Sequence, residues 1–166
     1  MSAESLRIED LIPHRGRMQL IDEIIEINEE TARTVSVVTT DWPLDETGLL
    51  SPLVLVELVA QTAGVHEGWK ACRQGKAGTK GWLVGVKKAD FFTDGLAPGT
   101  VLTTTVRTLY AMQTYAVFTG SVEAASKVLA QAELQVFRVE EEGGMAHPDG
   151  ESASAPGGDR DQGGAS

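Results

Sequence analysis

The sequence is poor in cysteine, with Cys72 as the single one among 166 residues. One cysteine excludes an internal disulfide framework and a cysteine-rich metal site. No set of residues has the spacing of metal ligands, and no glycine-rich dinucleotide fingerprint follows an expected strand. We therefore expect neither a metal nor any other cofactor.

Long apolar runs are also missing. No stretch reaches the roughly 18 apolar residues of a membrane helix, and residues 1–18 lack the apolar core of a secretory signal. This predicts a cytoplasmic protein with no membrane partner. Basic residues are few, because 14 Lys and Arg face 24 Asp and Glu, a formal net charge of −10. That balance argues against nucleic acid as a partner, since phosphate backbones bind basic surfaces.

The composition changes near residue 140. Residues 140–166 contain seven acids, one base, seven glycines and no aromatic residue. A segment of this kind buries too little apolar surface to offset the entropy of ordering it. We predict one folded domain over residues 1–139 and a disordered, acidic, glycine-rich tail over residues 140–166.

The folded part is predicted to be α+β. Helix formers fill residues 52–73, with Ser51 as N-cap, Pro52 at the first helical position and Gly75 just past the end. β-Branched and apolar runs predict six strands. The first two, 18–27 and 33–40, form a hairpin, and an antiparallel meander follows over 82–92, 101–112, 114–124 and 127–139. Because the helix is so apolar, we expect the sheet to wrap around it.

One carboxylate interrupts the apolar helix. At about 100° per residue, Leu53, Glu57, Ala60, Gln61 and Gly64 share a face. Partial desolvation would raise the pKa of Glu57 and let it act as a proton donor near neutral pH, and it could equally act as a base. Gln61 can hydrogen-bond to Glu57 or to water, and Gly64 lets a ligand or another backbone approach. The alternative is that Glu57 forms an ion pair at a subunit interface.

Three segments, taken together and in order, resemble a known family. They are LIPHRGRMQLID (11–22), PLVLVELVAQTAG (52–64) and LVGVKKADFFTDGLAPGT (83–100). They are similar to the 3-hydroxyacyl-(acyl carrier protein) dehydratases, which have the hot-dog fold, an antiparallel sheet wrapped around one long central helix. The opening with Pro-His-Arg is most similar to the dehydratase-like subgroup linked to aryl-polyene pigment clusters.

The resemblance implies an activity and a partner. The family removes water from 3-hydroxyacyl thioesters on acyl carrier protein to give trans-2-enoyl thioesters, in fatty acid or polyene biosynthesis. It implies a dimer with active sites at the interface, either a homodimer or a heterodimer with another hot-dog protein. The resemblance also implies that the carboxylate at the position of Glu57 acts with a histidine from the partner protomer.

The family's histidine is missing here, because the matching loop, residues 41–52, contains none. His14, in the opening motif, is the candidate substitute, and the alternative is that it only anchors the N-terminal segment. His66 lies nine residues after Glu57, which places it about 180° around the helix and away from the site. Asp41 and Asp45 in the altered loop are weaker candidates.

A basic stretch runs against the acidic balance of the chain. Between residues 70 and 88 there is no acid, and six bases occur: Lys70, Arg73, Lys76, Lys80, Lys87 and Lys88. Carrier proteins are acidic and the phosphopantetheine arm carries a phosphate, so these residues are candidates for carrier docking. The alternative is ordinary solvated surface charge.

Two other functions fit the same fold. Thioesterases with the hot-dog fold also place a carboxylate on the central helix, there to activate water. A non-catalytic subunit that completes the cleft of an active hot-dog partner would explain the missing loop histidine. The three functions predict different results. A dehydratase removes water from the substrate, a thioesterase releases free thiol, and a non-catalytic subunit is isolated as a heterodimer with its active partner.

Overall fold

The structure is a computed structural model that describes residues 7–75 and 80–139, without the side chains of 80–82 and 138–139. The predicted tail, Lys76 and the Lys80 side chain therefore lie outside the described residues. The elements follow in the order α1 (Ile8–Leu11), the 3-10 helix η2 (Gly16–Met18), β1 (Glu23–Ile27), β2 (Thr31–Val37), α2 (Val54–Arg73), β3 (Lys80–Phe91), β4 (Val101–Ala111), β5 (Tyr115–Ala124) and β6 (Lys127–Val139).

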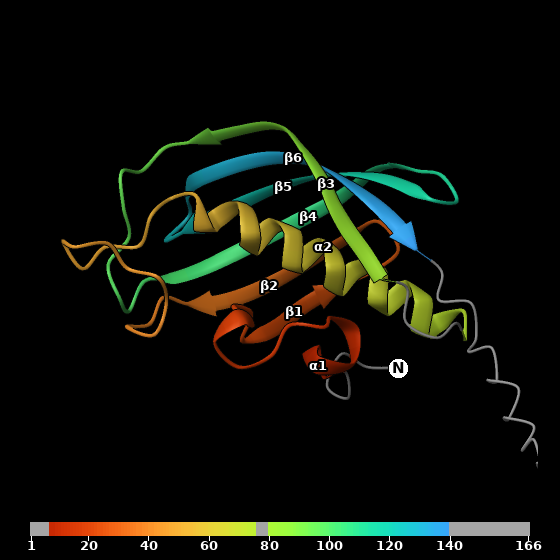
Figure 1. Cartoon of the computed structure of the whole chain (residues 1–166), viewed down its shortest axis with the longest axis horizontal. Helices are drawn as coiled ribbons and strands as arrows, with labels where there is room; N and C mark the ends of the chain where they lie inside the picture. The colour runs from red at the N-terminus through yellow and green to blue at the C-terminus, as the bar shows by residue number, and fades with distance from the viewer. Residues whose placement is uncertain (1–6, 76–79, 140–166) are drawn as a thin grey trace, which may run out of the picture.

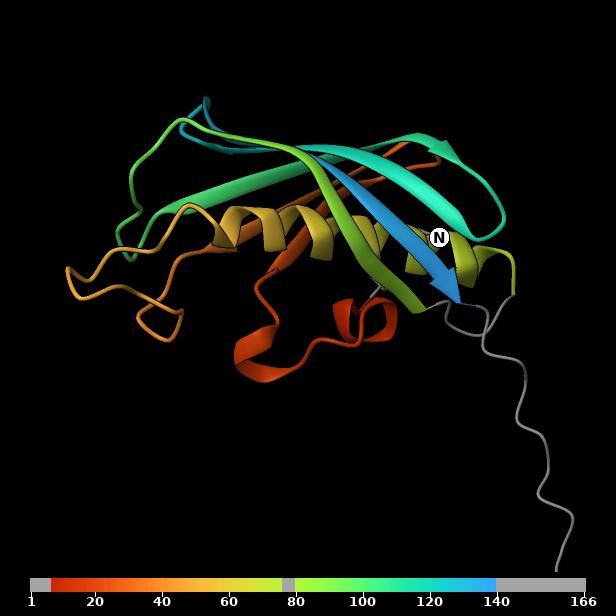
Figure 2. The same cartoon turned by 45° about the horizontal axis from the view of Figure 1, so that its top comes forward.

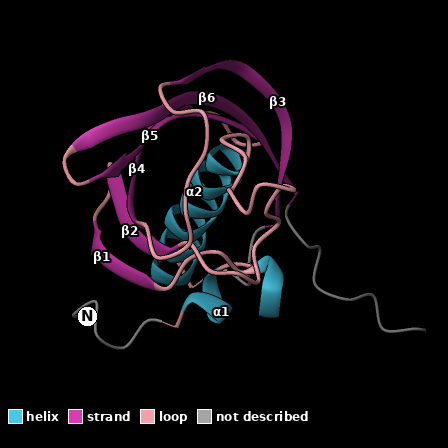
Figure 3. Ribbon diagram, turned by 90° about the vertical axis from the view of Figure 1, so that its left-hand side faces the viewer, coloured by secondary structure: helices cyan, strands magenta, loops and turns pink. Residues whose placement is uncertain are grey.

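The six strands form one antiparallel sheet in the order β1-β2-β4-β5-β6-β3. Seen along its axis, α2 lies in the hollow of this curved sheet (Figure 3). The predicted α+β architecture, a sheet wrapped around one long helix, is confirmed. Within the described residues, none of the helices is long and apolar enough to cross a membrane.

The predicted meander is wrong at its first strand. β3 pairs with β6 at the far side of the sheet and not with β4, so only β4, β5 and β6 form a meander. The connection over residues 92–100 contains the LAPGT turn but is too long for a tight hairpin, and Leu96 forms a β-bridge with Leu50. This connection lets the chain leave β3 at one edge and return to the sheet beside β2 (Figure 1).

The helix begins two residues later than predicted. Its N-cap position is Leu53, with no side-chain cap bond, and Ser51 reaches the nitrogen of Leu53 at 3.4 Å instead. Pro52 and Leu53 therefore form a turn that leads into α2. The first strand is also shorter than predicted, because residues 18–22 belong to η2 and the extended segment after it.

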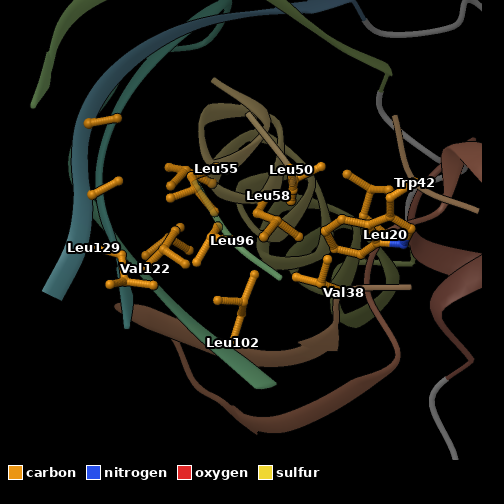
Figure 4. Close-up of a cluster of buried hydrophobic side chains, with 14 of the residues drawn as sticks. Leu20, Val38, Trp42, Leu50, Leu55, Leu58, Leu96, Leu102, Val122 and Leu129 are labelled. Carbon is orange, nitrogen blue, oxygen red and sulfur yellow. The ribbon is translucent and has the colours of Figure 1, made fainter. Parts of the chain in front are cut away.

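The main core lies between α2 and the concave face of the sheet. Its members are fully or almost fully buried, and burying each leucine contributes roughly 1.5–3 kcal/mol. Figure 4 shows these side chains converging from the helix, the strands and the loop before the helix. They include Leu20, Val38, Trp42, Leu50, Leu55, Leu58, Leu96, Leu102, Val122 and Leu129.

The N-terminal segment covers the side of α2 that faces away from the sheet (Figure 2). Ile8, Leu11 and Ile12 form a second core with Val65 and Trp69 of the helix. The approach is close at Gly68, where an added Cβ would overlap the main-chain oxygen of Leu11. The segment that carries His14 is therefore fixed against α2 by packing that only glycine permits.

Candidate active site

Glu57 lies on the first full turn of α2, on the face that the N-terminal segment partly covers. Its side chain is 39% exposed, and its Oε1 accepts a hydrogen bond from Nε2 of Gln61 at 2.9 Å. Gln61 is 1% exposed and also binds the N-terminal segment: Nε2 donates to the oxygen of Met18 at 2.7 Å, and Oε1 accepts from the nitrogen of Leu20 at 3.0 Å. Gln61 thus ties the carboxylate of Glu57 to residues 18–20.

His14 faces Glu57 from the N-terminal segment. Its Nε2 lies 3.3 Å from Oε1 of Glu57, and its side chain is 30% exposed. The main chain around it is held by Arg15, whose guanidinium donates to the oxygens of Glu9, Ile12 and His14 at 2.6–2.7 Å. One chain therefore brings an imidazole and a carboxylate together beside solvent.

The surroundings of this pair are apolar and open. Leu53, one turn before Glu57, is 69% exposed, and Met18 is 65% exposed. We call Met18 and Leu53 the apolar rim. A carboxylate and an imidazole beside an apolar rim can exchange protons with a substrate whose remaining chain is apolar. Gly64, predicted to contact substrate, faces Ile12 instead, since an added Cβ would lie 3.1 Å from Cγ2 of Ile12. Its contact with substrate stays a prediction.

The loop over residues 41–52, which matches the family's histidine loop, is held by hydrogen bonds within the loop itself. Oδ1 of Asp45 accepts from the nitrogens of Thr47 and Leu49 and from the Thr47 hydroxyl. The Thr47 hydroxyl, followed by the backbone nitrogen of Leu49, lowers the pKa of Asp45. Asp45 is thus engaged in holding the loop. The oxygen of Asp41 accepts from Nη2 of Arg17 at 3.2 Å.

His66 lies away from the site, as its position on the helix predicted. It is fully buried, its Nε2 donates to the oxygen of Asn28 at 2.8 Å, and the hydroxyl of Thr108 lies 3.4 Å from Nδ1. Burial, followed by the charge of Lys70, lowers the pKa of His66 to about 4. His66 is therefore neutral near pH 7 and serves the structure.

The basic stretch predicted for docking is largely engaged in local contacts. Arg73 pairs with Glu29 at 2.6 Å, Lys87 with Glu133 at 2.6 Å, and Lys88 with Asp90 at 2.8 Å. Lys70 lies 3.5 Å from the hydroxyl of Thr108. Carrier docking by these residues stays a prediction. In the part of the chain that the structure describes, no group of three His, Cys, Asp or Glu residues could hold a metal ion.

Sequence reasoning missed two contributors to the site: the main-chain carbonyl of Met18 and the guanidinium of Arg15. Arg15 and Arg17 stand in the same PHRGRM stretch as His14. This stretch was the available signal, because arginines so close to a candidate histidine can be expected to bind groups near it. A main-chain carbonyl such as that of Met18 leaves no signal in a sequence.

The sequence matches the family model of the ApeP-like proteins, described as ApeP dehydratase, over residues 6–146. It is 30% identical over 132 residues to the 3-hydroxyacyl-(acyl-carrier-protein) dehydratase FabZ of Streptococcus pneumoniae serotype 4, covering 76% of this chain and 91% of the relative. FabZ of Streptococcus thermophilus is 27% identical over 139 residues, covering 81% of this chain and 96% of the relative.

Among solved structures, a similar one is the dehydratase heterocomplex ApeI:P from Xenorhabdus doucetiae. The match has a TM-score of 0.76 and 22% identity, and covers 82% of this chain and 93% of that chain. At this identity the match shows the fold, which is the hot-dog fold predicted from the sequence.

Proposed function

Because the chain belongs to the ApeP-like dehydratase family, we propose that it removes water from 3-hydroxyacyl thioesters carried on acyl carrier protein and yields trans-2-enoyl thioesters. The observation that carries this proposal is the contact at 3.3 Å between His14 and Glu57 beside an apolar rim. The FabZ relatives, which are 3-hydroxyacyl-(acyl-carrier-protein) dehydratases, support the reaction type.

Dehydration needs two proton transfers on neighbouring carbons. One group takes a proton from C2, the electrons of that C–H bond form the C2–C3 double bond, and the C3–O bond breaks. The other group gives a proton to the departing hydroxyl, which leaves as water. We assign these two roles to His14 and Glu57. Because Oε1 of Glu57 faces both Gln61 and His14, its Oε2 is the oxygen available to substrate.

Gln61 is a positioning residue in this proposal. Its three hydrogen bonds to Glu57, Met18 and Leu20 orient the carboxylate and hold the segment that follows His14. A fixed orientation matters because small misplacements of a catalytic group slow the reaction strongly.

A dimer formed through β3 belongs to the same proposal. β3 is hydrogen-bonded to β6 on one side, and its other side has no strand neighbour among the described residues. Three apolar side chains on β3 are 43–57% exposed: Leu83, Val84 and Val86. A long apolar edge strand invites pairing with another strand. The ApeI:P heterocomplex supports a second hot-dog protein as the partner, and a second copy of this chain is the alternative.

Three finer assignments accompany the reaction. The cell compartment is the cytoplasm, the pathway is polyene biosynthesis of the aryl-polyene type, and the basic stretch contributes to carrier docking. The family match and the heterocomplex support the pathway. Thioester hydrolysis is not favoured, since the matching family and the relatives are dehydratases.

The test is intact-mass measurement of a 3-hydroxyacyl carrier protein after incubation with the protein. Wild type removes one water from the acyl carrier, and the Glu57→Gln variant, which keeps the size of the side chain, does not. Release of the acyl group would instead show a thioesterase. An unchanged mass, with activity restored by an added hot-dog partner, would show that the chain is the non-catalytic half of a complex.

A further inference from the structure

Next to Met18 of the apolar rim, the chain carries a guanidinium group that the proposed reaction does not use. Arg17 is exposed and lies in η2, directly before Met18, whose oxygen is bonded to Gln61. Gln61 in turn is bonded to Glu57. Two hydrogen bonds through Gln61 therefore connect Met18, the neighbour of Arg17 in the chain, to the carboxylate of Glu57.

The loop that Arg17 contacts and the helix after it are poor in positive charge. Residues 34–69, which include the loop before α2 and most of the helix, contain no lysine or arginine and five acids. The acids are Asp41, Asp45, Glu46, Glu57 and Glu67. An anionic substrate would be repelled from such a surface unless another segment supplied positive charge. The N-terminal segment supplies it through Arg15 and Arg17.

The two arginines differ in how many donors are in use. Arg15 donates to three main-chain oxygens and so holds the turn that carries His14. Arg17 makes one hydrogen bond, from Nη2 to the oxygen of Asp41, among the described residues. A guanidinium has five N–H donors. Arg17 is thus the guanidinium with donors left for a ligand, and it contacts the loop before α2 at Asp41.

We propose that Arg17 binds the phosphate of the phosphopantetheine arm that carries the acyl thioester; this rests on the proposed function. A planar guanidinium binds phosphate oxygens in a bidentate manner, which a lysine does not. From Arg17 through Met18 to Glu57 the site offers a cation, an apolar side chain and an acid–base pair. Phosphate, pantetheine and thioester follow in that order in a carrier-bound substrate.

The test compares two ligands by calorimetry: the stable amide analogue of a 3-hydroxyacyl phosphopantetheine, and the same compound without its phosphate. Wild type binds the phosphorylated analogue more tightly, by roughly ten-fold for a charge-assisted contact. Arg17→Gln abolishes this preference and Arg17→Lys keeps part of it. Arg107→Gln is the matched control, because Arg107 is also exposed, at β4, with Glu30 at 3.9 Å, and its variant keeps the full preference.

The outcomes separate this inference from the proposed function. Equal binding of the two analogues to wild type, including no binding of either, overturns the role of Arg17. A phosphate preference that survives in Arg17→Gln also overturns this role. The role is likewise overturned if Arg17→Gln loses as much affinity for carrier protein without its arm as for the phosphorylated analogue, because Arg17 would then bind carboxylates of the carrier. Dehydration is measured on the same preparations. Its absence with the phosphate preference intact would contradict the proposed function alone.

Discussion

One side-chain nitrogen of Gln61 serves two acceptors, Oε1 of Glu57 at 2.9 Å and the main-chain oxygen of Met18 at 2.7 Å. The same amide accepts from Leu20 through its oxygen. A buried glutamine with all these contacts joins the central helix to the N-terminal segment at the point where the carboxylate and the imidazole meet. The geometry of the pair therefore depends on Gln61.

Gln61→Glu tests this dependence. The change keeps an acceptor for Leu20 but removes both donated hydrogen bonds and sets a second carboxyl beside Glu57. We expect the free energy of unfolding to fall by about 2 kcal/mol and kcat to fall roughly ten-fold or more. Urea unfolding and steady-state kinetics measure the two effects.

Thr62→Val is the control for this variant. Thr62 is also buried on α2, but its hydroxyl bonds to Leu58 and Thr34, on the side of the sheet. Its loss is expected to lower stability by about 1 kcal/mol and to leave kcat unchanged. If the two variants lose kcat equally, Gln61 acts through stability alone.

A catalytic role of His14 and a role in anchoring the N-terminal segment predict different effects of replacing it. His14→Gln is expected to lower kcat by roughly 100-fold, the contribution of one acid or base, and to change the free energy of unfolding by less than about 1 kcal/mol, as expected for a partly exposed side chain. Kinetics and urea unfolding of the same sample check both values. A large loss of stability with little change in kcat would show that His14 is an anchor.

The packing at Gly68 is predicted to control the site from a distance. Gly68→Ala places a Cβ on the carbonyl of Leu11 and is expected to cost about 1–3 kcal/mol of stability, as overpacking does. Because Leu11 precedes His14 by three residues, kcat should fall as well. Gly64→Ala meets only the side-chain carbon Cγ2 of Ile12, at 3.1 Å, and should cost less. Equal effects of the two changes would contradict this ranking.

The buried neutral His66 predicts a pH dependence of stability. Its pKa is about 4 in the folded protein against a usual 6.5, so the unfolded chain binds more protons between these values. Stability therefore falls as the pH drops from 6.5 to 4, by about 3 kcal/mol for the full shift. Urea unfolding at several pH values should show this slope in wild type and a smaller slope in His66→Gln. Identical slopes would contradict the assignment.

The free edge of β3 predicts the effect of a charge on assembly. Val84 is 57% exposed on that edge, and Val84→Lys places a charge where the proposed partner strand would pair. We expect the variant to fold and to sediment as a single chain, while wild type sediments as a dimer or, with its hot-dog partner, as a heterodimer. Unchanged assembly of the variant would place the interface elsewhere.

Much of the fold was predictable because its local patterns are strong. The helix begins two residues after its predicted start, and β6 has the predicted bounds because its alternation is regular. The place of β3 was not predictable in this way, because a strand pattern says nothing about which neighbour the strand takes. The apolar helix predicted that the sheet wraps around it, and the resemblance identified this arrangement as the hot-dog fold. The observed sheet order then corrected the predicted meander.

In the site, too, the contact between neighbours on the helix was predictable and the long-range contact was not. Glu57 and Gln61 are one helical turn apart, so their contact follows from the period of the helix. The contact of His14 with Glu57 spans 43 positions and depends on the Arg15 hydrogen bonds and the packing at Gly68. Neither is visible in a local pattern, and His14 was a candidate only through its motif.

The pairing of His14 and Glu57 within one chain is tested most directly by mixing subunits. Glu57→Gln and His14→Gln chains are prepared separately, each strongly impaired, and then combined as homodimers under conditions in which chains exchange. If both groups act within one chain, no site in the mixture is complete, and the rate of enoyl thioester formation stays at the level of the separate variants. If each site instead takes one group from each chain, the mixture recovers about a quarter of the wild-type rate. That recovery would contradict the pairing of His14 and Glu57 within one chain.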